Sequence, residues 1–94
     1  MITVTREMGM THRDFFRTFP SVAGDRPVQI EGSVVRLETG QGEIVIRLGP
    51  EQVRKIALLT LPLVHLQFDF HGHDQDQAAV FMARFDLSFR RGGG

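Results

Sequence analysis

Residues 64–74, Val-His-Leu-Gln-Phe-Asp-Phe-His-Gly-His-Asp, carry the clearest structural signal in this chain. Apolar and polar side chains alternate along the stretch. The apolar positions are Val64, Leu66, Phe68 and Phe70, and the polar positions are His65, Gln67, Asp69, His71 and His73. Successive side chains of a β-strand point to opposite faces of the sheet. The alternation therefore predicts a strand with one face in the core and the other turned outward.

The outward row also holds a candidate metal site, formed by Asp69, His71 and His73. Residues two apart on a strand lie on one face about 6.5–7 Å apart, so two imidazoles so placed can turn onto one ion. Asp74 or Asp76 could add a second carboxylate from the start of the next helix. A ligand set of nitrogen and oxygen atoms suits zinc, nickel or copper.

The alternative to a metal site is a row of solvated side chains on a strand that ends at Gly72, with Gly72 and His73 belonging to a turn. His65 and Gln67 share the face without belonging to any ligand set, which favours this alternative. Acid–base catalysis by the same histidines would need further groups, and the chain contains no Gly-x-Ser-x-Gly, His-Glu-x-x-His or phosphate-binding glycine loop. The sequence therefore predicts no catalytic or cofactor-binding residue and favours a non-enzymatic protein.

The elements before this strand are predicted from alternation and helix-capping signals. Residues 2–6 are β-branched and alternate, as in a short strand. Thr11 and Asp14 are spaced as in a capping box at a helix start, and Pro20 is expected to end or bend that helix. Its apolar face is formed by Phe15, Phe16 and Phe19.

The middle of the chain is predicted to be mostly extended. Residues 28–39 change their apolar phase near Gly32, as a turn or bulge would require, and residues 43–48 alternate again after the turn at 40–42. Residues 50–59 are ambiguous. Pro and Glu at the start and several good helix formers favour a short helix, but the alternation of Ile56 and Leu58 leaves a strand open.

A last helix is predicted from Asp74 to about residue 91, followed by a glycine tail over residues 92–94. Its apolar stripe is formed by Ala78, Phe81, Met82, Phe85 and Phe89. The order of elements predicts one α+β domain over residues 1–94, with a mostly antiparallel sheet of about four strands and two helices on one face. If residues 50–59 are helical, the order matches a ferredoxin-like fold with an extra C-terminal helix.

The composition excludes several classes of protein. Eleven basic and eleven acidic residues cancel, and nucleic-acid binders need a surplus of positive charge, so we expect no nucleic-acid partner. Without cysteine, the chain has no disulfide and no thiolate metal site. The longest apolar stretch, residues 56–64, is far shorter than the roughly 20 residues of a membrane helix. We therefore expect a soluble cytoplasmic protein with no membrane partner.

These observations predict a small, non-enzymatic binding or protein-interaction module. The expected contact surface is the polar face of the sheet or its edge beside His71. Val80 and Leu87 lie seven residues apart, opposite the apolar stripe of the last helix, and could pair with another protein or a second copy of this chain. The rival prediction is a metal-binding or metal-dependent protein that uses Asp69, His71 and His73 with zinc, nickel or copper.

Overall fold

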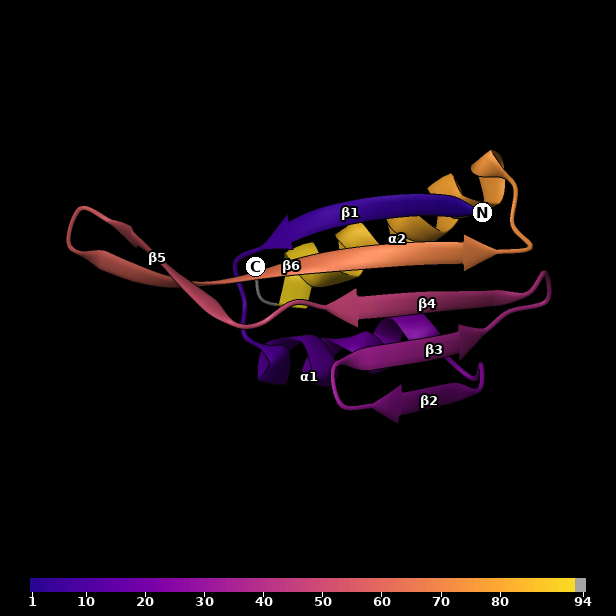
Figure 1. Ribbon diagram of the computed structural model, residues 1–94, viewed down its shortest axis with the longest axis horizontal. Coiled ribbons are helices and arrows are strands. Elements are labelled where there is room, and N and C mark those ends of the chain that lie inside the picture. Colours follow the sequence, from indigo (N-terminus) through magenta and orange to yellow (C-terminus); the bar gives the residue numbers. More distant parts are fainter. Residues whose placement is uncertain (93–94) are drawn as a thin grey trace.

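The protein is an α+β domain in which two helices cover one face of an antiparallel sheet (Figure 1). The computed structural model describes residues 1–92, with side chains up to residue 90. Six strands form the sheet, in place of the four or so predicted from the sequence. The elements are β1 (Ile2–Met8), α1 (His12–Ala23), β2 (Val28–Glu31), β3 (Val34–Glu38), β4 (Glu43–Leu48), β5 (Gln52–Ile56), β6 (Leu59–His71) and α2 (Gln75–Gly92).

Strand β6 is the centre of the fold. It pairs with β1 on one side and with β4 on the other, and the sheet runs in the order β1-β6-β4-β3-β2. The strand predicted to begin at Val64 and to be ended by Gly72 is confirmed, since β6 ends at His71. Its four apolar side chains are each at most 1% exposed and lie in the core: Val64, Leu66, Phe68 and Phe70. The odd positions face the other side of the sheet, as the alternation required.

The capping box predicted for the first helix is confirmed. The Thr11 hydroxyl accepts a hydrogen bond from the Asp14 amide at 3.1 Å, and the Asp14 carboxylate accepts one from the Thr11 amide at 3.2 Å. Helix α1 continues through Pro20 to Ala23 and ends at Gly24, whose φ of 61° is a conformation that glycine adopts readily. Phe15 and Phe19 then pack into the core.

The second helix lies beside α1 and completes the core. Asp74 accepts a hydrogen bond from the Gln77 amide at 2.8 Å and caps α2, as predicted. The Phe85 ring stacks on Phe89 at a centroid distance of 4.2 Å and meets Phe68 of β6 edge-on at 4.8 Å. The predicted apolar stripe is therefore the buried face of α2. Of the predicted glycine tail, Gly92 is the last residue of α2, and residues 93–94 lie outside the described part.

Residues 50–59 form a hairpin, and the helix favoured there by the sequence is wrong. Strand β5 pairs antiparallel with the first part of β6, from Gln52 opposite Leu63 to Ile56 opposite Leu59. Strand β4 ends at Leu48, so β5 supplies the main-chain partners for the part of β6 that extends beyond it. Main-chain pairing outweighs local helix propensity, which differs by less than about 1 kcal/mol among ordinary residues. The ferredoxin-like order is accordingly not confirmed.

We call residues 52–63 the arm, because this hairpin projects from the body of the sheet (Figure 1). The arm lies at one end of the long axis of a molecule that measures 45 × 24 × 22 Å. The two turns at the other end, between β3 and β4 and between β6 and α2, lie far from it. Neither described helix is long and apolar enough to cross a membrane.

Candidate functional site

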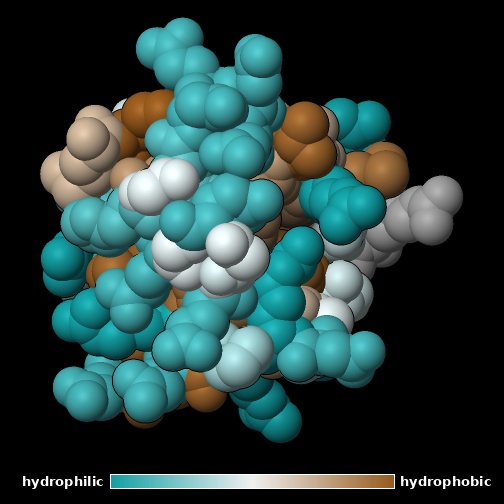
Figure 2. Space-filling view, turned by 90° about the vertical axis from the view of Figure 1, so that its right-hand side faces the viewer, coloured by the Kyte–Doolittle hydropathy of each residue, from teal (hydrophilic) through white to brown (hydrophobic). Residues whose placement is uncertain are grey.

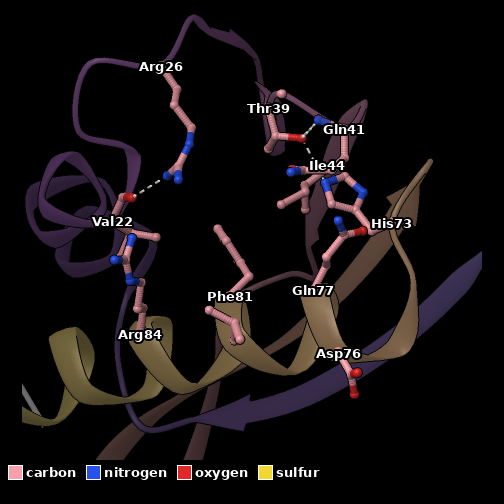
Figure 3. A pocket seen from close by; sticks show the side chains of 12 residues that line it. Val22, Arg26, Thr39, Gln41, Ile44, His73, Asp76, Gln77, Phe81 and Arg84 are labelled. Atoms are coloured by element: carbon pink, nitrogen blue, oxygen red, sulfur yellow. Dashed lines mark hydrogen bonds between the residues drawn. The ribbon is translucent and has the colours of Figure 1, made fainter.

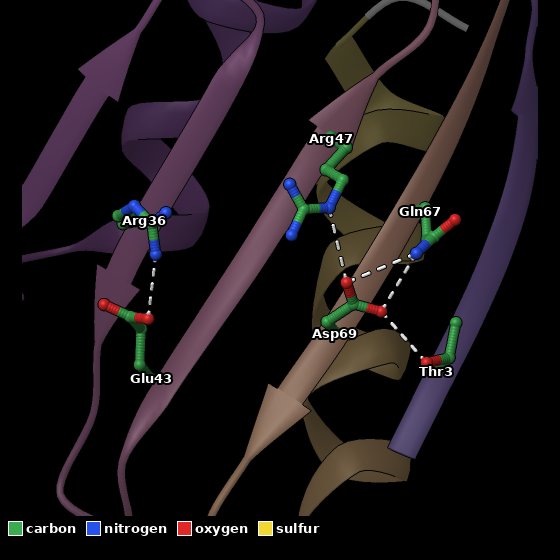
Figure 4. Close-up of polar contacts among 6 residues, drawn as sticks. All are labelled: Thr3, Arg36, Glu43, Arg47, Gln67 and Asp69. Carbon is green, nitrogen blue, oxygen red and sulfur yellow. Dashed lines mark hydrogen bonds and ion pairs between the residues drawn. The ribbon is translucent and has the colours of Figure 1, made fainter. Parts of the chain in front are cut away.

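The outer face of the sheet, away from the helices, carries a buried carboxylate held by three neighbours. Asp69 is only 4% exposed. It accepts hydrogen bonds from the Thr3 hydroxyl at 2.9 Å and from the Gln67 amide at 3.1 and 3.2 Å (Figure 4). Arg47 Nε lies 3.4 Å from its other side. Burial raises the pKa of Asp69, but these three partners lower it by more, so that it lies below its usual value.

The charges on the neighbouring strands are also paired within the chain. Arg36 of β3 lies 3.2 Å from the Glu43 carboxylate of β4 (Figure 4). Val45 occupies the outer face directly between Arg36 and Asp69 in the sheet register, and is nevertheless only 2% exposed. The long side chains around it cover this valine while their charged ends remain in water. On this part of the outer sheet face, the positive and negative side chains are therefore paired with one another within the chain.

The three residues of the predicted metal site lie in different surroundings. Strand β6 ends at His71, which is exposed on the outer side, and Gly72 turns the chain with a φ of 91°. His73 is thereby carried to the helix side, where its ring meets Phe70 edge-on at 5.6 Å and Nε2 lies 2.7 Å from the Thr39 hydroxyl. Its Nδ1 is buried and has no hydrogen-bond partner in the described part of the chain.

The other two histidines make separate contacts. The Nε2 of His12 donates a hydrogen bond to the Gly49 carbonyl at 2.6 Å. His65 lies 3.3 Å from the Glu7 carboxylate, on the outer face. Within residues 1–92, no three or more histidine, aspartate or glutamate side chains are grouped so that they could hold a metal ion. The metal hypothesis stays a prediction, without a ligand cluster to support it.

The arm exposes the largest concentration of apolar side chains in the described structure. Five of its aliphatic residues are exposed, by the following fractions of their surface: Val53 62%, Ile56 50%, Leu58 100%, Leu59 62% and Leu61 41%. No residue of the arm belongs to the buried core. Single exposed apolar residues need no explanation, but several of them on one projecting hairpin are typical of a contact surface.

The apolar phase of β6 reverses where the arm begins. Up to position 63 the apolar side chains stand at odd positions, with Leu59, Leu61 and Leu63, and from position 64 they stand at even positions. The odd positions lie on the outer face, on which Ile56 of β5 is directly paired with Leu59. The apolar row of the arm therefore faces away from the side on which the helices cover the sheet. We call Ile56, Leu59, Leu61 and Leu63 the outer apolar row.

The tip of the arm is made of residues unusual for a tight turn. Ala57 has a φ of 54°, the one non-glycine residue with a positive φ among those described. Two-residue hairpin turns generally place glycine, asparagine or aspartate at such a position, because a Cβ is disfavoured there. Leu58, beside it, is completely exposed. A strained turn with a fully exposed leucine is typical of a site of contact.

One ion pair connects the arm to the body. Arg54 of β5 pairs with Glu7 near the end of β1, and this hydrogen bond is the main cause that lowers the pKa of Glu7. Arg54 lies opposite Leu61 and so belongs to the outer face, whereas Lys55 lies opposite Thr60 on the other face of the arm. Arg54 is thus the one cationic side chain of the arm on the face of the outer apolar row, and it is already paired with Glu7.

The opposite end of the molecule has a different character. Figure 2 looks onto the end farthest from the arm, which is predominantly hydrophilic. Val80 and Leu87 of α2 are exposed by 61% and 50%, as predicted for the second strip of that helix.

No protein family, curated protein or solved structure that was compared with this chain matches it.

The sequence predicted the outward positions His65, Gln67, Asp69 and His71 correctly, but it placed His73 in the same row and missed the arm as a surface. The signal was present in residues 59–64, Leu-Thr-Leu-Pro-Leu-Val, where two adjacent apolar residues mark the change of phase. The sequence favours a helix for residues 50–59, and a helix there conceals the reversal of the apolar phase within a single strand. Two apolar residues in a row within an alternating strand indicate that the buried face changes there.

Proposed function

We propose that the protein is a small, non-enzymatic protein-interaction module that associates with a second copy of itself through the arm. The observation that carries this proposal is the outer apolar row with Leu58 at the tip, on a hairpin that contributes nothing to the core of its own chain. An extended ribbon of this kind gains little from folding alone, since an isolated two-stranded hairpin is marginally stable in water. Packing against another surface would supply the missing burial.

A second copy fits the arm because the row is self-complementary. In a two-fold dimer the same patch meets itself, and two sheets packed face to face lie about 10 Å apart. The row faces outward and carries no unpaired charge, since Arg54 is paired with Glu7 and Lys55 lies on the other face. Net charge also permits association: the eleven basic and eleven acidic residues leave no overall repulsion between copies.

The exposed surface sets the strength of the expected contact. The exposed fractions of Ile56, Leu58, Leu59 and Leu61 amount to roughly two to three whole side chains per arm, each worth about 1.5–3 kcal/mol when fully buried. Two copies therefore offer about 8–15 kcal/mol. If association costs about 4–6 kcal/mol, the low end of its range, the upper part of this gain gives a dissociation constant in the micromolar range, and we expect a dimer no tighter than this.

Analytical ultracentrifugation from about 1 to 300 µM would test the proposal, because this range spans the expected dissociation constant. Leu59→Glu places a charge in the outer apolar row and should leave a monomer at every concentration. Leu87→Glu is the matched control, because Leu87 is exposed to a similar degree but lies on α2. It should dimerise like the unmodified protein.

Two outcomes would contradict the proposal. A protein that stays monomeric over the whole range would exclude association through the arm at these concentrations. Loss of the dimer in Leu87→Glu but not in Leu59→Glu would assign the interface to the second strip of α2 instead. Circular dichroism of both variants should match the unmodified protein, since neither residue belongs to the core.

A further inference from the structure

A second site lies at the end of the molecule away from the arm. A pocket of about 420 Å³ opens between the end of α1, the turn that joins β3 to β4, and the first turns of α2 (Figure 3). This volume is within the usual range for small-molecule sites, about 300–1,000 Å³. Its apolar lining is formed by Val22, Ile44, Val80 and Phe81.

The polar side chains divide between the two ends of the pocket. Arg26 and Arg84 lie at the α1 end, and Phe81 lies in the middle (Figure 3). The other end carries neutral or weakly basic groups, those of Thr39, Gln41, His73 and Gln77. The pocket is thus cationic at one end, apolar in the centre and hydrogen-bonding at the other end.

The two arginines are available to a ligand. Arg26 makes a hydrogen bond of 3.5 Å to the Val22 carbonyl, and neither guanidinium forms an ion pair with a carboxylate of the described residues. Asp76 also lines the pocket, but its carboxylate points away from the two arginines (Figure 3). Five of the other arginines, by contrast, pair with Asp or Glu: Arg6, Arg17, Arg36, Arg47 and Arg54.

The far wall of the pocket is held in place by hydrogen bonds. The Thr39 hydroxyl accepts from the Gln41 amide at 3.2 Å and from the Gly42 amide at 3.1 Å, and lies 2.7 Å from His73 Nε2. This arrangement joins the β3–β4 turn to the segment that leads into α2. This wall of the pocket is therefore formed before any ligand enters, which lowers the entropic cost of binding.

We infer that this pocket binds a small organic monocarboxylate with an apolar body. Asp76 is the one acidic residue of the lining; it forms no ion pair with the arginines, but its negative charge offsets one of their two positive charges, which favours a monoanion over a dianion. Guanidinium groups recognise carboxylates through directed, charge-assisted hydrogen bonds. The apolar body lies over Phe81, Val22 and Ile44. This site goes beyond the proposed function and does not involve the arm.

The inference is tested by titrating the ¹⁵N-labelled protein with 4-phenylbutyrate and, separately, with the uncharged 4-phenylbutanamide. 4-Phenylbutyrate should shift the resonances of the backbone amides of Gly40 and Gln41 and of the side-chain amide of Gln77. It should bind about tenfold or more tighter than the amide, as expected for a charge-assisted hydrogen bond. Arg84→Gln should remove this preference while leaving binding of the amide unchanged.

Arg90→Gln is the matched control, because Arg90 is exposed on the same helix and does not line the pocket. It should retain the preference for the carboxylate. The inference is overturned if no shifts appear at about 5 mM, if acid and amide bind equally, or if Arg84→Gln keeps the preference. Phenylphosphonate completes the test: tighter binding of this dianion than of 4-phenylbutyrate would make the pocket a phosphate-type site and overturn the assignment to monocarboxylates.

Discussion

Replacing Asp69 by asparagine would show what the buried carboxylate on the outer face does. The substitution preserves shape and removes the charge. The contact with Arg47, whose side chain is 51% exposed, contributes less than about 1 kcal/mol. The larger loss comes from the hydrogen bonds of Thr3 and Gln67, one of which would face an amide NH₂ group instead of a charged oxygen. We expect a total loss of about 2 kcal/mol in the free energy of unfolding.

The effect should depend on pH in a direction that the structure determines. The pKa of Asp69 is lower in the folded protein than its usual value. Such a group stabilises the fold fully above its unfolded pKa of about 3.9, and the stabilisation is lost as the pH falls through the folded value. The difference between Asp69→Asn and the unmodified protein should therefore be complete at about pH 6 and should shrink as the pH falls below the unfolded pKa.

Urea unfolding followed by circular dichroism would measure both quantities. In thermal unfolding of a chain of this size, the same loss of about 2 kcal/mol would lower the melting temperature by about 10 °C. Glu43→Gln is the control, since the Glu43–Arg36 pair shares the outer face but has side chains 38% and 44% exposed. It should cost less than about 0.5 kcal/mol. Equal stabilities at pH 6, or a difference that persists unchanged at pH 2, would refute the role assigned to Asp69.

Two further substitutions, each with a control, probe the turn after β6 by urea unfolding. Gly72→Ala should destabilise the fold by about 2–4 kcal/mol, because φ is 91° and the new Cβ would press on the β3–β4 turn. Its control, Gly40→Ala, meets open space and should change stability by less than about 0.5 kcal/mol. His73→Ala should cost about 1–2 kcal/mol, because the ring packs on the core and contacts Thr39, and His71→Ala should be nearly neutral. Equal loss of bound zinc, nickel or copper from both histidine variants, measured by plasma mass spectrometry, would instead support a shared metal site.

Local sequence patterns were sufficient to predict the elements that are determined by residues close together in the chain. The capping residues Thr11 and Asp14 act within one turn, and the structure forms the box that their spacing predicts. The change of apolar phase near Gly32 likewise predicted a bulge or a tight turn, and the structure has a turn there, with Ile30 of β2 paired with Val35 of β3. These features depend on contacts within a few residues, so tertiary packing did not alter them.

Contacts between distant residues determined the features that the sequence left open. Helix propensity favoured a helix at residues 50–59, but the unpaired main chain of β6 required a strand beside it. The spacing of His71 and His73 predicted one face, but Gly72 turned the second histidine toward Thr39. The partners of Asp69 come from β1 and β4 as well as β6, and their meeting depends on the sheet order.

The sequence by itself determined an α+β chain, the two helices, and the inner face of β6 with its alternating Val64, Leu66, Phe68 and Phe70. Periodicity and capping are local properties, and they are readable without knowing the fold. Only the tertiary structure decided that the apolar residues before position 64 stay exposed on an arm, and that Arg26 and Arg84 meet at one pocket. The burial of a side chain depends on what other elements place over it, and no helix or strand within residues 1–92 covers the arm.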